Sequence, residues 1–320
     1  MTAPLPPPGK QLTVGDVFDT KQATLGLEVL TSRASLDRAV DDPDISSPGL
    51  ALAGFTQRFT AGRMQVLGET EMTYLSSLSE SVAAERLQGL FNFPIPALFV
   101  TKQLDVPKAL IDMADEAGIP VLRSTLSTKG FYRRIKPFLE SALAPTLSLH
   151  GSLADVYGVG LLFVGSSGVG KSECVLDLVE RGHRLVADDL VLASRRGTDV
   201  LIGRAHPLQG HHMEIRGIGI IDVQMLFGVR AIRQQKRIEV LVQLEHWDEN
   251  HTYTRTGLET ETVDILGVPI PKVTVPLNPG KNITVISEVV AMNHLLHYAG
   301  HDSAKAFDQH IRAYLEQDYE

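Results

Sequence analysis

Eight consecutive residues near the middle of the chain restrict its fold more than any other segment. They match the pattern G-x-x-x-x-G-K-S and comprise Gly165, Ser166, Ser167, Gly168, Val169, Gly170, Lys171 and Ser172. The apolar run 161–164 predicts a strand that enters the loop, and residues 171–181 predict a helix that leaves it. A strand, a glycine-rich turn and a helix in this order place the loop in an α/β domain with a buried sheet.

The residue types of this loop suit the binding of phosphate groups. Glycines let the backbone curl so that successive N–H groups point at phosphate oxygens, and the helix N-terminus adds a favourable dipole for anions. Lys171 can bridge the β- and γ-phosphates of a nucleotide, and the Ser172 hydroxyl can ligate Mg²⁺. We therefore expect all eight residues to bind a nucleotide. The alternative is a glycine-rich turn of the same shape that binds no ligand.

A phosphate-binding loop does not by itself define a reaction, because GTPases, transporter ATPases, kinases and regulators all contain one. The guanine-specific pattern N-K-x-D is absent after the loop, which argues against a GTPase. No L-S-G-G-Q stretch occurs either, which argues against a transporter ATPase. Kinases and nucleotide-sensing regulators remain as the open classes.

Two adjacent carboxylates, Asp188 and Asp189, follow the apolar run 185–187, and Asp188 lies 17 residues after Lys171. Carboxylates at a strand end beside such a loop suit two tasks. One orders Mg²⁺ or its water ligands, and the other accepts a proton from an attacking hydroxyl. We expect at least one of the two to take part in the chemistry. A turn in which both side chains only cap backbone groups is the alternative.

The length of 320 residues predicts two domains. Residues 1–10 are rich in proline, and we expect them to be a disordered lead-in. Over residues 11–143, strand-like and helical runs alternate, which predicts a small α/β domain with an assembly or regulatory role. Strand-like runs dominate residues 144–320, which predicts a P-loop domain with a mixed sheet and a few covering helices.

Some elements are predicted in more detail. In the first half we expect strands at residues 25–30 and 50–55 and one helix over residues 71–87, whose apolar residues lie near helical spacing. In the second half we expect a strand at residues 282–286 and a last helix over residues 304–317, with its apolar residues near one face.

Charge and composition restrict the partners. The formal net charge of −8 gives no electrostatic reason to expect a nucleic-acid partner. No run approaches the roughly 18 apolar residues of a membrane span, so we expect no membrane association. The one cysteine, Cys174, excludes an intrachain disulfide, and residues 1–10 lack the basic flank and the apolar stretch that are typical of a signal peptide. These features together predict a cytoplasmic protein.

Four segments together resemble the bacterial HPr kinase/phosphorylase family: residues 156–160, 165–173, 181–189 and 214–222. Residues 48–50, 53–55 and 65–68 resemble that family's N-terminal domain, so the resemblance covers nearly the whole chain. It implies an ATP- and Mg²⁺-dependent kinase that phosphorylates a serine of the phosphocarrier protein HPr in carbon-catabolite regulation. It also implies a P-loop domain related to phosphoenolpyruvate carboxykinase and assembly as a homohexamer.

The resemblance implies roles for individual residues as well. Lys171 and its loop would hold the nucleotide phosphates, and Ser172 and Glu214 would hold Mg²⁺. Asp189 would be the base in phosphorylation and the acid in the reverse direction. His150 and Arg255 match active-site residues of the family, and Arg255 would stabilise charge on the transferring phosphoryl group. Without the resemblance, both would be interpreted as ordinary surface residues.

One segment departs from the family pattern. The family's second activity is phosphorolysis, in which inorganic phosphate attacks the phosphoserine and pyrophosphate leaves, and a P-V-R-P-G-R-N segment is tied to it. Here the segment has Asn278 and Lys281 in place of the two arginines. Arginine binds phosphate through two parallel hydrogen bonds, whereas lysine is a point charge and asparagine is neutral. Our hypothesis is an intact kinase activity with weakened or altered phosphorolysis.

Two further features leave alternatives open. His206, His211 and His212 could bind a metal ion, although no cysteine completes a set of ligands around them. Residues 225–227, Met-Leu-Phe, could anchor a protein substrate or pack in the core. A kinase for a free small molecule would share the loop and Asp189. A nucleotide-sensing regulator would share the loop but would not depend on Asp189.

Overall fold

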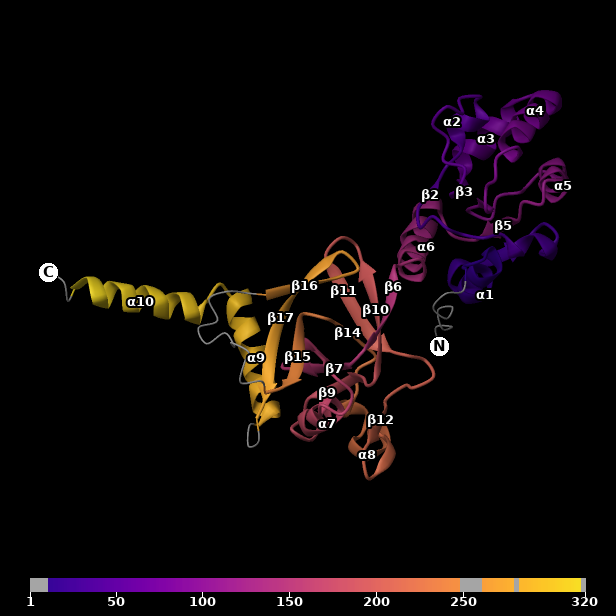
Figure 1. Ribbon diagram of the computed structural model, residues 1–320. Coiled ribbons are helices and arrows are strands. Elements are labelled where there is room, and N and C mark those ends of the chain that lie inside the picture. Colours follow the sequence, from indigo (N-terminus) through magenta and orange to yellow (C-terminus); the bar gives the residue numbers. More distant parts are fainter. Residues whose placement is uncertain (1–10, 248–260, 279–281, 318–320) are drawn as a thin grey trace. The chain divides into compact units, whose positions relative to one another are not determined.

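The computed structural model describes residues 11–247, 261–278 and 282–317 of the chain. It divides into two compact units, Met1–Ala144 and Pro145–Glu320, each with its own hydrophobic cores (Figure 1). Among the described residues, every helix is too short or too polar to cross a lipid bilayer.

The N-terminal unit is built on a five-stranded sheet with strand order β1-β5-β4-β3-β2. Four strands are parallel, and β1 pairs with β5 in the antiparallel sense. All residues of β3 and β4 are buried, as expected for strands covered on both faces. The strands are β1 (Leu27–Val29), β2 (Ile45–Ser46), β3 (Met64–Leu67), β4 (Leu98–Val100) and β5 (Val121–Ser124).

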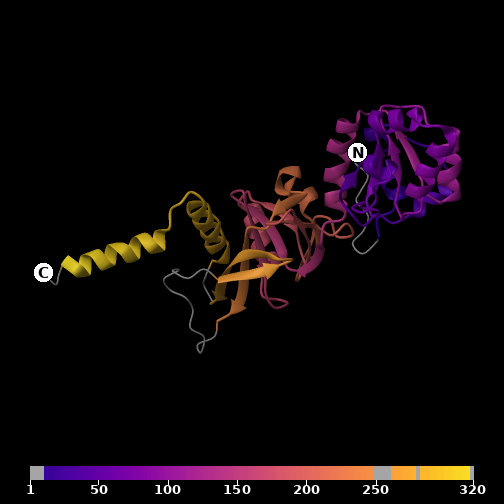
Figure 2. The ribbon, with the colours of Figure 1, turned by 90° about the horizontal axis from the view of Figure 1, so that it is seen from above.

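Helices cover both faces of this sheet (Figure 2). The helices α1 (Val14–Leu25) and α6 (Thr128–Ala142) pack on one face around Phe99. The other face packs around Leu98 and is covered by α2 (Gly49–Leu52), α3 (Glu69–Ser77), α4 (Glu80–Phe91) and α5 (Lys108–Glu116). A short 3-10 helix, Arg33–Asp37, links β1 and β2.

Two predicted elements of this unit were wrong. The strand expected at residues 50–55 is the helix α2 followed by a turn, where Gly54 adopts a left-handed φ of 98°. The single helix expected over residues 71–87 is two helices, because Leu78 is extended (φ −87°, ψ 157°) and ends α3. Ser79 then starts α4 as its N-cap residue, a position that serine favours.

The C-terminal unit contains two sheets and a hairpin. The first sheet has strand order β16-β17-β15-β8-β7-β9, and its central strands β17, β15 and β8 are parallel. It comprises β7 (Ser152–Val156), β8 (Val159–Val164), β9 (Arg184–Ala187), β15 (Val240–His246), β16 (Glu261–Ile265) and β17 (Val268–Leu277).

The second sheet is antiparallel, with strand order β14-β11-β10-β6. It comprises β6 (Thr146–His150), β10 (Leu190–Arg196), β11 (Val200–Ala205) and β14 (Gln235–Arg237). The hairpin consists of β12 (His212–Ile215) and β13 (Gly219–Asp222), and is followed by the helix α8 (Val223–Phe227) and a 3-10 turn, Val229–Ala231.

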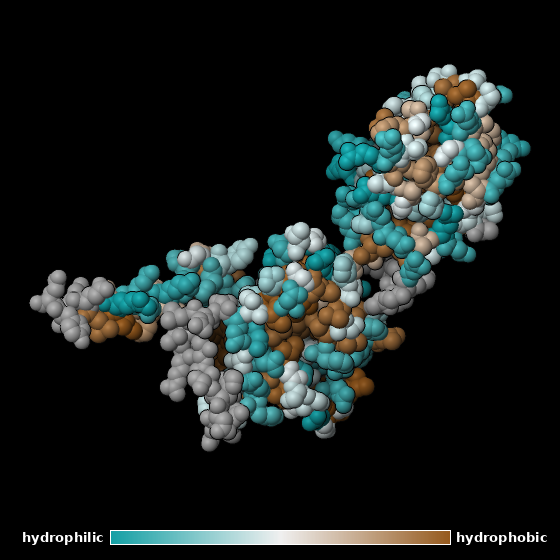
Figure 3. All heavy atoms as spheres, turned by 45° about the horizontal axis from the view of Figure 1, so that its top comes forward, coloured by the Kyte–Doolittle hydropathy of each residue, from teal (hydrophilic) through white to brown (hydrophobic). Residues whose placement is uncertain are grey.

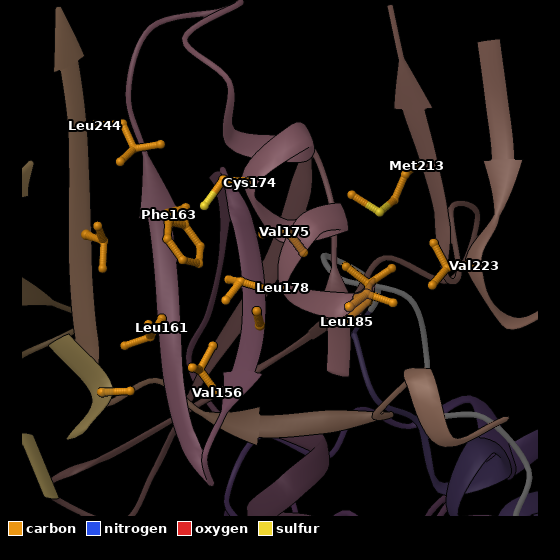
Figure 4. Packing of buried hydrophobic residues seen from close by; sticks show 14 of the residues in the cluster. Val156, Leu161, Phe163, Cys174, Val175, Leu178, Leu185, Met213, Val223 and Leu244 are labelled. Atoms are coloured by element: carbon orange, nitrogen blue, oxygen red, sulfur yellow. The ribbon is translucent and has the colours of Figure 1, made fainter. Parts of the chain in front are cut away.

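The six-stranded sheet carries a core on each face. One face packs on the second sheet around Leu153 and Leu162. The other face packs on α7 (Lys171–Glu180) and α9 (Ile283–Tyr298). Figure 4 shows Cys174 of α7 beside Phe163 of β8, with the hairpin residue Met213 on the other side of the helix. This packing fixes α7, whose first turn follows the phosphate-binding loop.

The C-terminal helices differ from the prediction in one respect. The strand expected at residues 282–286 is the start of α9, because the Asn282 side chain caps the helix by accepting a hydrogen bond from the Val285 N–H at 3.1 Å. The last helix, α10 (Ser303–Gln317), forms as expected. Figure 3 shows hydrophobic side chains gathered along α10, where Phe307, Ile311, Tyr314 and Leu315 are exposed.

Candidate functional site

The loop between β8 and α7 adopts a conformation that only glycine permits at several positions. Gly165, Gly168 and Gly170 have φ values of 150°, 78° and 98°. A Cβ atom at position 165 would also lie 2.3 Å from the Leu244 carbonyl oxygen. The loop therefore passes directly over the end of β15, and α7 begins at Lys171 with its N-terminus at the loop.

Lys171 is held inside the loop that precedes it. Its Nζ donates hydrogen bonds to the carbonyl oxygens of Gly165 and Ser166, both at 3.0 Å. The ammonium group thus lies over the mouth of the loop, at the positive end of α7. This is where the phosphates of a nucleotide would meet both the charge and the free backbone N–H groups of the first helical turn.

A buried carboxylate lies beside the first turn of α7. Asp188 is 4% exposed, and its carboxylate accepts hydrogen bonds from the hydroxyls of Ser172 (2.9 and 3.0 Å to its two oxygens) and Ser152 (2.5 Å). Burial raises the pKa of Asp188, and the two hydroxyl groups act in the opposite direction. A desolvated carboxylate next to a hydroxyl is an arrangement of hard oxygen ligands that suits Mg²⁺.

Asp189 lies at the point where the chain passes from one sheet to the other. It follows β9 of the six-stranded sheet and precedes β10 of the second sheet, with a left-handed φ of 59°. Unlike Asp188, it is exposed. Its carboxylate accepts a hydrogen bond from the Gln209 side-chain amide at 3.4 Å, whereas Gln209 Oε1 is buried and has no hydrogen-bond partner in the described part of the chain.

The sheet register brings His150 next to this turn. His150 is the last residue of β6 and lies opposite Leu190 of β10. The following N–H, that of Gly151, donates to the Asp189 carbonyl oxygen at 3.0 Å. His150 is exposed. An exposed histidine and an exposed carboxylate therefore lie at neighbouring positions of two paired strands, close to the buried Asp188.

The hairpin β12–β13 supplies an acid and an arginine. Met213 and Ile215 are buried against α7, so the alternating side chain of Glu214 lies on the opposite, exposed face. Arg216 follows, and its guanidinium packs on the loop: a Cβ atom at Gly168 would lie 2.7 Å from Nη1. Within the described chain, no hydrogen bond joins Glu214 to Ser172 or Asp188; Ser172, predicted to hold Mg²⁺ together with Glu214, is hydrogen-bonded to Asp188.

Some predicted residues lie elsewhere or outside the described residues. Arg255 and Lys281 fall outside them, and Asn278 follows β17. No group of three or more metal-ligating side chains forms among the residues that the structure describes. His211 and His212 instead contact the backbone carbonyl oxygens of Arg233 (3.3 Å) and Gln209 (2.8 Å).

Three residues at the site were not among those predicted. Arg216 had a signal, because it belongs to the M-E-I-R-G segment beside Glu214. Ser152 and Gln209 had none. Each is a common polar residue far from Asp188 and Asp189 in sequence, and only the pairing of strands brings them together.

Large apolar side chains are exposed on the segment that follows Arg216. We call them the 218–229 patch: Ile218, Ile220, Met225, Leu226, Phe227 and Val229. Met225 is 82% exposed, which excludes core packing as the role of this side chain within the chain. Exposed apolar residues gathered on one short segment are typical of surfaces that bind another protein.

Comparisons with known proteins show which chains this one resembles. The family model of the HPr Serine kinase N terminus matches residues 12–139, and that of the HPr Serine kinase C-terminal domain matches residues 141–311. The HPr kinase/phosphorylase of Chloroherpeton thalassium is 45% identical over 305 residues, 95% of this chain and 90% of that protein. That of Shouchella clausii is 44% identical over 306 residues, 96% of this chain and 97% of that protein.

One solved structure is also similar in sequence. The Hpr(Ser) kinase/phosphatase from Coxiella burnetii is 33% identical, with a TM-score of 0.45, and the match covers 50% of this chain and 98% of that one. Both family models and relatives of nearly equal length match the chain along almost all of it. The chain therefore belongs to the HPr kinase/phosphorylase family.

Proposed function

We propose that this protein transfers the γ-phosphoryl group of ATP to a serine hydroxyl of HPr. The observation that carries the proposal is the meeting of a phosphate-binding loop with two different carboxylates. One, Asp188, is buried against Ser172, and the other, Asp189, is exposed. Phosphoryl transfer to a hydroxyl needs both a metal ligand and a proton acceptor, and this turn provides a candidate for each.

In the proposed reaction, the serine Oγ forms a bond to the γ-phosphorus while the bond from that phosphorus to the β–γ bridging oxygen breaks, and ADP leaves. Asp189 takes the proton from the serine hydroxyl. Gln209 orients the Asp189 carboxylate.

Lys171 moves from the loop carbonyls to the phosphates, and Arg216, which already packs on the loop, is placed to contact them. Arg255 stabilises charge on the transferring group, and His150 lies beside the base.

The residues present fit a bound Mg²⁺. The Ser172 hydroxyl and the Asp188 carboxylate would hold it, and Glu214 would join them from the exposed face of β12. The raised pKa of Asp188 means that burial disfavours its ionised form, and a cation beside it would offset that cost. When bound, Mg²⁺ would neutralise part of the charge on the β- and γ-phosphates.

We further propose that HPr docks on the 218–229 patch. A protein substrate must present its serine to the mouth of the loop, and the patch starts two residues after Arg216, which touches Gly168. We also propose a homohexamer, in which a neighbouring copy covers the apolar side chains of α10. The cytoplasm, where ATP is available as a substrate, is the proposed location of the reaction.

The reverse reaction is proposed to be weak. In phosphorolysis an oxygen of inorganic phosphate forms a bond to the phosphorus of phosphoserine, the serine C–O–P link breaks at phosphorus, and Asp189 returns the proton to the serine oxygen. The second phosphate needs its own cationic site. Asn278 and Lys281 offer less than the two arginines of the family pattern.

One experiment separates the three functional candidates. The purified protein is incubated with γ-labelled ATP, Mg²⁺ and HPr, or with HPr whose target serine is replaced by alanine. Label on the serine form alone is the expected result. Label on neither form, with nucleotide binding intact, would favour a small-molecule kinase or a nucleotide-sensing regulator. In the regulator, Asp189→Asn would leave function unchanged, whereas in a kinase it removes turnover and leaves nucleotide binding intact.

A further inference from the structure

The N-terminal unit contains a cavity that the reaction proposed above does not use. It is an open hollow on the surface with a volume of about 450 Å³, and most of its lining residues are exposed. One of its walls is formed by α2 and the turn that follows α2, and the other wall is formed by α4. Its lining consists of Ala51, Gly54, Thr56, Glu85, Arg86, Gln88, Gly89 and Asn92.

Arg86 is the unusual member of this lining. It is half-buried, its Nε is buried, and no hydrogen bond or ion pair involves its side chain among the residues that the structure describes. A buried guanidinium N–H without an acceptor is unfavourable, because the group has lost its hydrogen bonds to water and gained none in the protein. An arginine kept in this state beside a cavity is explained if an anion in the cavity accepts its hydrogen bonds.

The backbone next to Arg86 makes room for its guanidinium. Gly54 has a left-handed φ of 98°, and a Cβ atom at this position would lie 2.7 Å from Arg86 Nη1. The guanidinium therefore packs directly on the turn after α2, where any other residue would displace it. The turn and α4 together hold the planar group at the edge of the cavity.

The other lining side chains define the chemistry of the ligand. Thr56, Gln88 and Asn92 carry hydroxyl and amide groups that can donate hydrogen bonds, and the Glu85 carboxylate can accept them. One of these donors is already in use, since Gln88 Nε2 donates to Asn92 Oδ1 at 3.3 Å. A site with one unpaired cation, several neutral donors and one acceptor suits an oxyanion on a molecule that also carries hydroxyl groups.

We propose that this cavity, the Arg86 cavity, binds a small hydroxyl-bearing molecule through a phosphate or carboxylate group on the Arg86 guanidinium. All residues that line the cavity belong to the N-terminal unit, whereas the phosphate-binding loop belongs to the C-terminal unit, so the cavity is not part of the site proposed for phosphoryl transfer. This inference does not depend on the identity of the phosphoryl acceptor.

The test measures amide hydrogen exchange of the full chain carrying Lys171→Met, which weakens phosphate binding at the loop. Glycerol 3-phosphate and glycerate serve as matched probes that carry a phosphate or a carboxylate, and glycerol serves as the neutral control. We expect at least one of the two anions, and not glycerol, to slow exchange over residues 49–56 and 80–92. The anion that protects identifies the oxyanion.

Arginine variants decide whether Arg86 is responsible. Arg86→Gln is expected to weaken binding of the protecting probe by about tenfold or more, as loss of a charge-assisted bidentate contact does. Arg133→Gln, on the exposed face of α6, is the matched control and should leave binding unchanged. If Arg86→Gln unfolds the unit, Thr56→Val provides a milder second variant that should also weaken binding. Protection by neither anion, or protection that survives Arg86→Gln in a folded protein, would overturn the proposal.

Discussion

The Oγ of Ser172 lies 2.9 Å from Oδ2 and 3.0 Å from Oδ1 of Asp188, so the first turn of α7 is joined to the end of β9 at the candidate metal site. The same carboxylate accepts the Ser152 hydroxyl from β7. Three elements therefore meet on one buried acid. Because burial raises the pKa of Asp188, its ionised form opposes stability, whereas the metal-binding role proposed for it requires that form.

Asp188→Asn should stabilise the protein at high pH and inactivate it. The folded-state pKa of Asp188 lies above its ordinary value of 3.8. The protonated acid therefore contributes its full stability below pH 3.8, and this contribution is lost as the pH rises through the folded-state pKa. At pH 8 the buried, ionised carboxylate of Asp188 destabilises the fold, whereas an uncharged asparagine does not. We expect a gain of about 1 kcal/mol in urea denaturation at pH 8, which shrinks as pH falls, with phosphoryl transfer slower by about 100-fold or more.

The matched control for this experiment is Asp189→Asn, because Asp189 is exposed. It should also lose turnover, but its free energy of unfolding should stay within about 0.5 kcal/mol of the wild type. A clear loss of stability in Asp188→Asn at pH 8 would contradict the assignment of Asp188 as a desolvated ion.

Glu288→Gln should loosen α9. Glu288 accepts hydrogen bonds from Arg181 Nε at 2.8 Å and Nη2 at 2.6 Å and pairs with His183 Nε2 at 3.1 Å. The Arg181 hydrogen bonds lower the pKa of Glu288 to about 2, despite its burial. Its contribution to stability is thus complete above pH 4.5 and is lost as pH falls toward 2. We expect a loss of about 2 kcal/mol at pH 7 by chemical denaturation.

The control is Glu180→Gln, because Glu180 is an exposed acid at the end of α7, next to Arg181. It should change stability by less than about 0.5 kcal/mol. Equal losses from both glutamine variants would show that the pair with Arg181 contributes little.

Gln209→Ala tests the positioning of the proposed base. Gln209 contacts the Asp189 carboxylate, and loss of an orienting contact misplaces the proton acceptor without removing it. We expect kcat to fall by about tenfold with an unchanged KM for ATP. Leu208→Ala, at the neighbouring and more exposed position, should leave kcat unchanged. Equal activity of the two variants would mean that Gln209 does not position Asp189.

Met225→Asp tests the docking surface. A charge at the centre of the 218–229 patch should raise the KM for HPr by about 30-fold, the cost of removing one strong apolar contact of an interface, while ATP binding stays unchanged. Leu50→Asp is the control, because Leu50 is also a large apolar residue that is mostly exposed, and it lies in the N-terminal unit. An unchanged KM for HPr in Met225→Asp would place the docking surface elsewhere.

The double variant Asn278→Arg/Lys281→Arg tests the weakened reverse reaction. Two guanidinium groups restore bidentate phosphate binding, so phosphorolysis measured as pyrophosphate release should rise by about tenfold, chiefly through a lower KM for phosphate. The forward rate should change little. Wild-type phosphorolysis as fast as the kinase reaction would refute the hypothesis before any variant is made.

The sequence predicted the parts of the site that are local. The loop from Gly165 to Ser172 is visible because its glycines are needed for backbone reasons, and the strand and helix around it follow from short-range patterns. Composition and spacing could not separate Asp188 from Asp189, since their burial depends on which strands flank the turn, and only the family resemblance assigned the role of base to Asp189. For the same reason, the contact of Ser152 with Asp188, across 36 positions, was not predictable.

The errors in the fold have a similar origin. Residues 50–55 and 282–286 are apolar and short, and at that length a helix and a strand cannot be told apart by periodicity. In the structure, Gly54 and the Asn282 cap decide the outcome. The break at Leu78 lies in a serine-rich stretch, and serine favours the N-cap position of a helix. The regular spacing of apolar residues on either side nevertheless predicted one continuous helix.

Lys171 donates to two carbonyl oxygens of its own loop. An arriving nucleotide must therefore compete with an intramolecular acceptor that is always present, and a departing one leaves an ammonium group that already has new partners. Such a built-in competitor would lower the affinity of the loop for any nucleotide whose phosphates must displace it, and it would keep the lysine partnered whenever the loop is empty.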